Sequence, residues 1–125
     1  MGQLSYYYDG DIYTCDEGRM ISEAGKYGFR LGNVYKSSYD DLIQNPVCKA
    51  TAIASVVETL PGCSDCVFQP YCGVCPVVTY AMEGDIFPKA PHGFRCEIYK
   101  GIQKILFTKI MEADEEVMKV LYSWV

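Results

Sequence analysis

Cysteine thiols are the side chains of this sequence whose number and spacing point most clearly to chemistry. The chain has seven of them, Cys15, Cys48, Cys63, Cys66, Cys72, Cys75 and Cys96. Four fall in one short segment, LPGCSDCVFQPYCGVCP, residues 60–76. Prolines and glycines interrupt this segment so often that a tightly turning loop is predicted. Burial as a small hydrophobe explains an isolated cysteine but poorly explains four in such a loop, so the segment favours metal or cluster ligation.

Disulfide bonding is the first alternative, and three observations oppose it. Seven is an odd number of cysteines, and the first residues, MGQLSYYYDGDIY, lack the basic and apolar regions of a secretory signal. A chain of 125 residues is also long enough to build a hydrophobic core without cross-links. We therefore expect a soluble, unexported, cytoplasmic chain with free thiols.

The spacing of the thiols separates two kinds of metal site. Cys63 and Cys66 form a C-x2-C pair, Cys72 and Cys75 form a second pair five residues later, and Cys96 follows after a further twenty. Zinc-binding pairs are usually separated by roughly 12–20 residues. Consecutive thiols plus a distant one are more typical of iron–sulfur proteins. An iron–sulfur cluster is therefore favoured, and zinc stays as the alternative.

The elements that must position these thiols begin with a β-hairpin. Asp9-Gly10 stands between tyrosine-rich arms and predicts a tight turn, with Cys15 just after the second strand. A short extended segment, FRLGNV, follows a glycine-rich turn. SSYDDLIQ then predicts a helix capped by Ser37 or Ser38. Asn45-Pro46 begins another helix, predicted to reach residue 60, where Pro61-Gly62 ends it.

Two C-terminal helices are predicted after Cys96, over residues 97–111 and 114–125. Their apolar residues recur at helical spacing and are expected to face a core. These residues are Ile98, Ile102, Ile105, Leu106, Ile110, Val117, Val120, Leu121 and Trp124. The predicted fold is α+β: an N-terminal β-hairpin, helices and a cysteine-rich loop, closed by the two C-terminal helices. Since there is no repeat, linker or low-complexity tract, residues 1–125 are predicted to be a single domain.

Charge and hydropathy exclude two classes of partner. The net charge is −5, and the eleven lysines and arginines are scattered, so a nucleic-acid-binding surface is not expected. No apolar run approaches the ~18 residues of a membrane span.

The C-x2-C-x5-C-x2-C run with Cys96 downstream, preceded by YDGDIYTC and FRLGNV, resembles the SPASM domain. That domain is the C-terminal auxiliary-cluster domain of radical S-adenosylmethionine (SAM) enzymes that mature peptides and proteins. The resemblance runs from about residue 6 to the end. LPGCSDCVFQPYCG, GDIFPKAP and LYSWV look most like the maturase of the His-Xaa-Ser peptide system.

The resemblance implies two sets of cluster ligands. The auxiliary [4Fe–4S] cluster farther from the SAM site would take Cys63, Cys66, Cys72 and Cys96. A second, nearer cluster would take Cys15 and Cys75, with Cys48 as the remaining thiol. This chain departs from the family at two points of the nearer set. Ser37 stands where the family usually has a cysteine, and the run closes with C-x2-C instead of C-x3-C.

The resemblance also implies what the chain does within a larger protein. No triplet has the C-x3-C-x2-C spacing that holds the SAM-cleaving cluster, and no Ser/His/Asp set is apparent around the single histidine. The chain is therefore expected to be a fragment that is not catalytic alone. It would work with an upstream radical SAM barrel on a ribosomally made peptide or protein, in electron transfer and substrate positioning. The alternative is a zinc-stapled peptide-binding module with no redox role.

Overall fold

A small antiparallel sheet forms the N-terminal end of the molecule, as predicted. The computed structural model describes residues 3–125. Strands β1 (Ser5–Tyr6), β2 (Asp11–Tyr13) and β3 (Arg30–Asn33) lie in the order β1-β2-β3. Gly10 in the hairpin turn has φ +86°, and a Cβ there would lie 2.9 Å from Val34 Cγ2. Glycine is thus required both for the left-handed conformation and for the close approach of the next strand's end.

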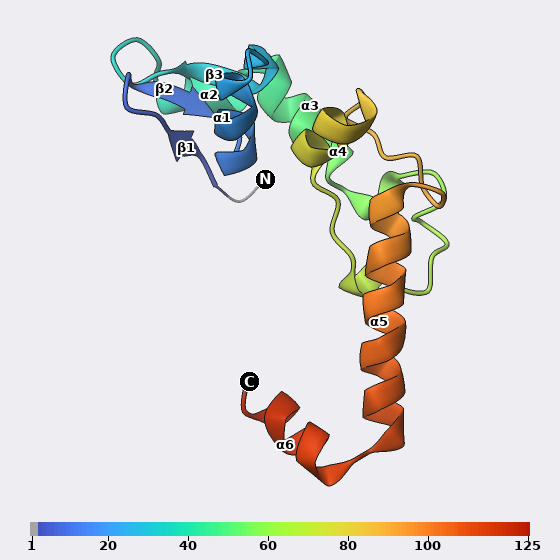
Figure 1. Ribbon diagram of the computed structural model, residues 1–125. Coiled ribbons are helices and arrows are strands. Elements are labelled where there is room, and N and C mark those ends of the chain that lie inside the picture. Colours follow the sequence, from blue (N-terminus) through green and yellow to red (C-terminus); the bar gives the residue numbers. More distant parts are fainter. Residues whose placement is uncertain (1–2) are drawn as a thin grey trace.

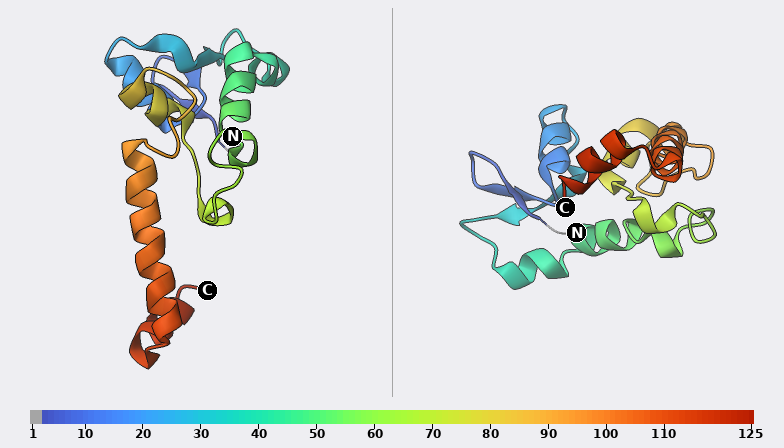
Figure 2. Two further views of the ribbon diagram at one scale, coloured as in Figure 1. Left: turned by 90° about the vertical axis from the view of Figure 1, so that its right-hand side faces the viewer. Right: turned by 90° about the horizontal axis from the view of Figure 1, so that it is seen from below.

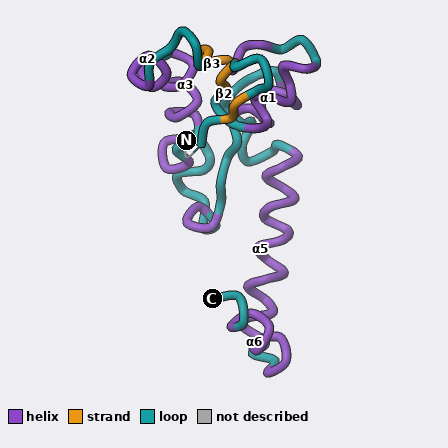
Figure 3. Tube along the Cα trace, turned by 90° about the vertical axis from the view of Figure 1, so that its left-hand side faces the viewer, coloured by secondary structure: helices purple, strands orange, loops and turns teal. Residues whose placement is uncertain are grey.

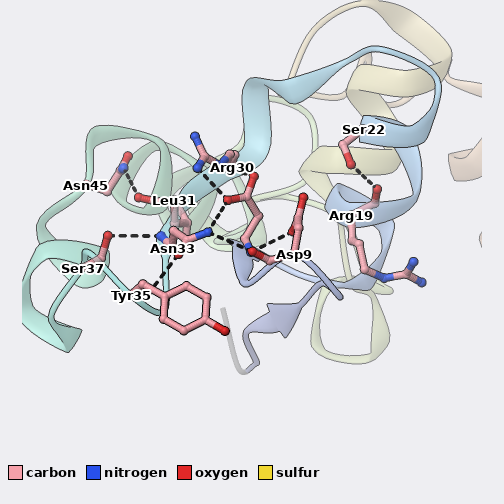
Figure 4. A network of polar contacts seen from close by, with 10 residues as sticks. Asp9, Arg19, Ser22, Arg30, Leu31, Asn33, Tyr35, Ser37 and Asn45 are labelled. Carbon is pink, nitrogen blue, oxygen red and sulfur yellow. Dashed lines mark hydrogen bonds and ion pairs between the residues drawn. The ribbon is translucent and has the colours of Figure 1, made fainter.

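Polar contacts fix the pairing of β2 with β3 (Figure 4). The side chain of Asn33 donates to Asp11 Oδ1 at 2.8 Å, and Arg30 donates to the same oxygen at 2.6 Å. Two hydrogen bonds and a full charge pair therefore meet at Asp11. The hydrogen bonds to Arg30 and Asn33 outweigh desolvation and lower the pKa of Asp11.

Helix α1 (Asp16–Glu23) follows the hairpin and was absent from the elements predicted from the sequence. Its buried residues are Gly18 and Ser22, so no apolar period marks the face that it packs inward. Two other features of this segment favour a helix. Its first turn carries acidic residues, and Arg19 forms an ion pair with Glu23 at 3.0 Å.

Helices α2 (Tyr39–Gln44) and α3 (Pro46–Ala54) confirm the predicted capping signals. Ser38 caps α2 in a capping box with Asp41. The Asn45 side chain accepts the N–H of Val47 at 2.8 Å and donates to the carbonyl of Leu31 at 2.9 Å. The cap of α3 is thereby tied to strand β3.

The α3 helix is shorter than predicted, because it ends at Ala54 and not at residue 60. A 3-10 turn, η2 (Val57–Thr59), redirects the chain, and this turn buries Val57 and Leu60. Ile53, near the end of α3, is 61% exposed and takes no part in this packing.

The hydrophobic core lies between the sheet and helices α2 and α3. Its central cluster is Ile12, Leu31, Leu42 and Cys48, with Leu4 and Val47 packed against it. Tyr13 and Phe29 are also buried. All of these residues precede the cysteine-rich loop.

The cysteine-rich loop contains one 3-10 turn, η3 (Gln69–Tyr71), and leads into helix α4 (Pro76–Glu83). Helix α4 was not predicted either. It begins with Pro76 at its first position, buries Val77 and Thr79, and packs against α1 and α3.

Two helices end the chain, as predicted, but they do not lie on the core. Helix α5 (Phe94–Glu112) runs past the cysteine-rich loop and continues away from the sheet, as Figures 1 and 2 show. Helix α6 (Glu115–Tyr122) turns back at its far end, after Ala113 in a left-handed conformation with φ 51°. The tube trace in Figure 3 shows the same arrangement from another side.

The expectation that the C-terminal apolar residues face a core is therefore wrong for most of them. Ile98, Ile102, Ile105, Leu106 and Ile110 are 43–64% exposed, and Trp124 is 72% exposed. The face of α5 that meets the cysteine-rich loop instead carries Cys96, Gln103 and Phe107. No helix within residues 3–125 has the length and apolar character needed to cross a membrane.

Candidate metal centre

Cys63, Cys66, Cys72 and Cys96 line one cavity between the loop and the start of α5. We refer to them as the loop–helix cysteines. Backbone turns place the first two, since the N–H of Cys63 donates to Leu60 O and that of Cys66 donates to Cys63 O, both at 3.0 Å. Cys72 follows η3, and Cys96 lies in the first turn of α5. The structure thus brings together all four residues of the set that sequence assigned to the far cluster.

Gly62 permits the close packing of this loop against the segment that leads into α5. Its φ is +74°, and a Cβ at this position would lie 3.1 Å from the carbonyl oxygen of Ala90. A side chain would therefore be strained and would also press on backbone that lies only a few residues before Cys96. The glycine before Cys63 is a geometric requirement of the cavity.

Gln103 and an aromatic group hold the loop on the helix. Gln103 is buried, and its side-chain Nε2 donates to the carbonyl of Tyr71 at 2.8 Å. The Phe107 ring stacks near Phe68 at 6.3 Å between centroids and meets Tyr71 edge-on at 5.0 Å. These contacts fix η3, and hence Cys72, relative to the helix that carries Cys96.

The electrostatics of the cavity resist four free thiolates. Burial raises the pKa of Cys63, and the neighbouring thiols of Cys96, Cys72 and Cys66 raise it further. Burial likewise raises the pKa of Cys72, again with Cys96 contributing. A bound cationic centre would remove the repulsion and favour the thiolate form.

Two basic side chains and one backbone N–H near the cavity act in the other direction and favour the thiolate form of the cysteines. Lys100 lowers the pKa of Cys63, while Arg95 and the backbone N–H of Gly73 lower that of Cys72. Sequence reasoning missed these groups and Gln103. The signal for Gln103 and Phe107 was available in their spacing of seven and eleven residues from Cys96, which places all three on one helix face.

The donor set fits an iron–sulfur cluster, because four thiolates are the usual ligands of a [4Fe–4S] group. Within residues 3–125, no three cysteine, histidine or acidic side chains are close enough to bind a single metal ion as they stand.

Cys15 and Cys75 form a separate pair, which we call the capping pair. Each is the N-cap of an eight-residue helix, Cys15 of α1 and Cys75 of α4. Their thiols interact directly and line a second cavity. The structure therefore joins the two residues that the family pattern assigns to the nearer cluster.

Neither of the other residues associated with the nearer set joins the capping pair. Cys48 is 6% exposed and packs in the hydrophobic core with Ile12 and Leu42. Ser37 accepts the backbone N–H of Asn33 at 3.2 Å, beside strand β3 (Figure 4). Neither residue lines the cavity of the capping pair.

Comparison with known proteins gives one match. A family model described as SPASM, an iron–sulfur cluster-binding domain, matches residues 2–67, which include Cys15, Cys63 and Cys66. No curated protein matches the chain, and no solved structure does.

Proposed function

Because this chain belongs to the SPASM family of iron–sulfur cluster-binding domains, we propose that its loop–helix cysteines hold one auxiliary [4Fe–4S] cluster. We further propose that the domain serves electron transfer and substrate positioning in a radical SAM enzyme that modifies a peptide or protein. The observation that carries the first proposal is the shared cavity of Cys63, Cys66, Cys72 and Cys96.

The chain's own residues would bind this group and set its surroundings. A [4Fe–4S] cluster supplies one-electron chemistry when bound. Lys100 and Arg95 place positive charge near the thiolates, and the Gly73 N–H points toward Cys72. Positive charge and N–H donors near cluster sulfurs favour the more negative, reduced state. Phe68 lines the cavity beside η3 and stacks on Phe107.

The radical SAM role rests on family membership together with an absent motif. The sequence has no C-x3-C-x2-C triplet, so SAM binding and cleavage would belong to an upstream barrel domain. The chain would then act as part of a larger enzyme on a ribosomally made substrate. The resemblance to the His-Xaa-Ser maturase suggests a peptide of that system.

Anaerobic reconstitution with iron and sulfide tests the cluster. We expect about four iron and four sulfide per chain and a broad visible absorption band. Replacing Cys72 and Cys96 together by alanine should abolish iron binding. Cys48→Ala is the matched control, because it removes a thiol that lies outside the cavity, and it should keep the iron. A colourless protein that binds about one zinc and no iron would instead support the zinc-stapled module.

The enzymatic role needs the domain in its larger protein. The chain is joined to a barrel that carries the triplet, and 5′-deoxyadenosine and modified peptide are measured separately. The Cys72→Ala plus Cys96→Ala enzyme should still cleave SAM without coupling but should not modify the peptide. Normal peptide modification by this variant would contradict the proposed role.

A further inference from the structure

The residues around the capping pair do not supply a second four-thiolate cluster. Of the cysteines in residues 3–125, four line the cavity of the loop–helix set, and Cys48 lies in the hydrophobic core. Ser37 stands at the position where the family pattern has a cysteine. Its hydroxyl oxygen accepts a hydrogen bond from the backbone N–H of Asn33. Cys15 and Cys75 remain, and Cys75 also lies near the loop–helix set, because it lines a cavity with Cys63, Cys72 and Cys96.

The fold brings these two sulfurs together on rigid elements. Helices α1 and α4 pack against each other, and each begins at one of the two cysteines. The Gly18 N–H donates to Cys15 Sγ at 3.4 Å, and the Thr14 hydroxyl donates to it at 3.8 Å. Two helix N-termini thus point their positive ends at one pair of sulfurs.

The pair is accessible from outside. Both thiols are only half-buried and line an open cavity of about 470 Å³. Its wall also carries hydroxyl groups and a carboxyl group, from Thr51, Ser55 and Glu17. A small polar molecule can therefore reach the sulfurs, in contrast to the buried Cys48.

The two thiols differ in their affinity for a proton. The interaction with Cys15 lowers the pKa of Cys75 to about 6, and the N–H groups of Val78 and Val77 act in the same direction. The same interaction, together with burial, raises the pKa of Cys15. Cys75 is thus the more acidic thiol of the pair, and Cys15 is the one that keeps its proton to higher pH. A thiolate beside a protonated thiol is the arrangement used for thiol–disulfide exchange.

We propose that Cys15 and Cys75 are a redox-active dithiol, which forms an intramolecular disulfide by exchange with a low-molecular-weight disulfide, and that they do not ligate a second cluster.

The exchange balances in two steps. The Cys75 thiolate attacks one sulfur of the small disulfide, which forms a mixed disulfide and releases one small thiolate. Cys15 gives its proton to that thiolate, and its sulfur then attacks the Cys75 sulfur and displaces the second small thiolate, which takes a proton from solvent. Two protein thiols are oxidised to one disulfide, and one small disulfide is reduced to two thiols.

The test uses the reconstituted chain of residues 1–125 under anaerobic conditions in buffers of oxidised and reduced glutathione. Free thiols are alkylated, the chain is digested with trypsin, and linked peptides are identified by tandem mass spectrometry. Cys15 is the only cysteine of tryptic peptide 1–19, and Cys75 lies in peptide 50–89. We expect these two peptides to become linked through Cys15 and Cys75, with two fewer free thiols per chain and no loss of iron.

Single variants decide between the dithiol and a second cluster. Cys75→Ser should abolish the link, and Cys15→Ser should trap glutathione on Cys75. Both variants should keep the iron content of the unaltered chain, and Cys48→Ala should keep both the iron and the link.

Three results would overturn the proposal: a loss of about half the iron in either serine variant, a link through a loop–helix cysteine, or no link at any glutathione ratio in a chain that circular dichroism shows to be folded. Iron content reports the loop–helix cysteines, and the peptide link reports the capping pair. The proposed cluster and the proposed dithiol can therefore fail independently.

Discussion

The region before the cysteine-rich loop and the region after it are ordered by different forces. Residues 3–60 contain the hydrophobic cluster of Ile12, Leu31, Leu42 and Cys48 and the capped helices that enclose it. In α5, by contrast, Gln103 is the one buried residue among those that the structure describes, and most of its isoleucines face outward. Apolar burial therefore explains the first region and helix α4, which packs on it, whereas the placement of the cysteine-rich loop against α5 depends on what their thiols bind.

Removing the bound cluster should have the largest effect, because it should disorder the cysteine-rich loop and leave the N-terminal region folded. Without a bound cluster, only a few contacts, such as those of Gln103 and Phe107, tie a loop rich in glycine and proline to α5. We expect amides of residues 61–75 to exchange with an opening free energy near zero, while β2, β3, α3 and the packed helix α4 stay protected. Hydrogen exchange of reconstituted and metal-free chains measures this. Equal protection of the loop in both samples would show that its order does not need the cluster.

A core substitution should affect the other region. Leu42→Ala removes a buried side chain from the central cluster and should lower the free energy of unfolding of the N-terminal region by about 2–5 kcal/mol. Iron per folded chain should not change, because Leu42 lies outside the cavity. Urea unfolding and iron analysis of the same sample measure both effects. Iron loss without loss of N-terminal stability would contradict the division into two regions.

Gln103→Leu should produce a smaller effect, confined to the second region. The substitution removes the donor to Tyr71 O, which costs about 1–2 kcal/mol, although Gln103 Oε1 is itself buried without a partner and its removal offsets part of that cost. We expect iron release to a chelator to accelerate a few-fold. Lys104→Leu, at the exposed neighbouring position, is the control and should release iron at the original rate.

The smallest expected effect on the free energy of unfolding comes from the ion pair of Asp11 with Arg30 in the sheet. Because the pKa of Asp11 is lower in the folded chain than in the unfolded one, its carboxylate stabilises the fold above the unfolded pKa, about 3.9. This contribution is lost as the pH falls through the lowered pKa. Asp11→Asn should therefore cost at most about 1 kcal/mol at pH 7, since Arg30 is 45% exposed, and almost nothing near pH 2. Urea unfolding at the two pH values measures the difference, and an equal cost at both would exclude the charge pair as its cause.

Local signals explain which parts of the fold could be predicted from the sequence. Asp9-Gly10, Ser38 and Asn45-Pro46 act through contacts within a few residues, and each was confirmed. Helices α1 and α4 escaped prediction because their buried faces are made of small or mixed residues, such as Gly18, Ser22 and Thr79. Their inward faces are decided by contacts between distant segments, which no local period records.

The candidate site was predictable to a similar extent. Family resemblance grouped the loop–helix cysteines, and the structure places all four around one cavity. The pairing of Cys15 with Cys75 followed from family resemblance, and its geometry depends on the packing of α1 on α4. The orientation of α5 could not be inferred, because an apolar helix face has the same period whether it meets a core or lies open.

The single tryptophan of the chain, Trp124, lies just beyond α6 and is 72% exposed. Intrinsic tryptophan fluorescence therefore reports the far end of the helical extension and is insensitive to the core around Leu42. The tyrosines Tyr7 and Tyr13 lie in the opposite region, with ring centroids 6.5 Å apart. Seven of the eleven tyrosines precede the cysteine-rich loop, so denaturation curves recorded by tryptophan emission and by tyrosine absorbance weight the two regions differently, and their midpoints need not coincide.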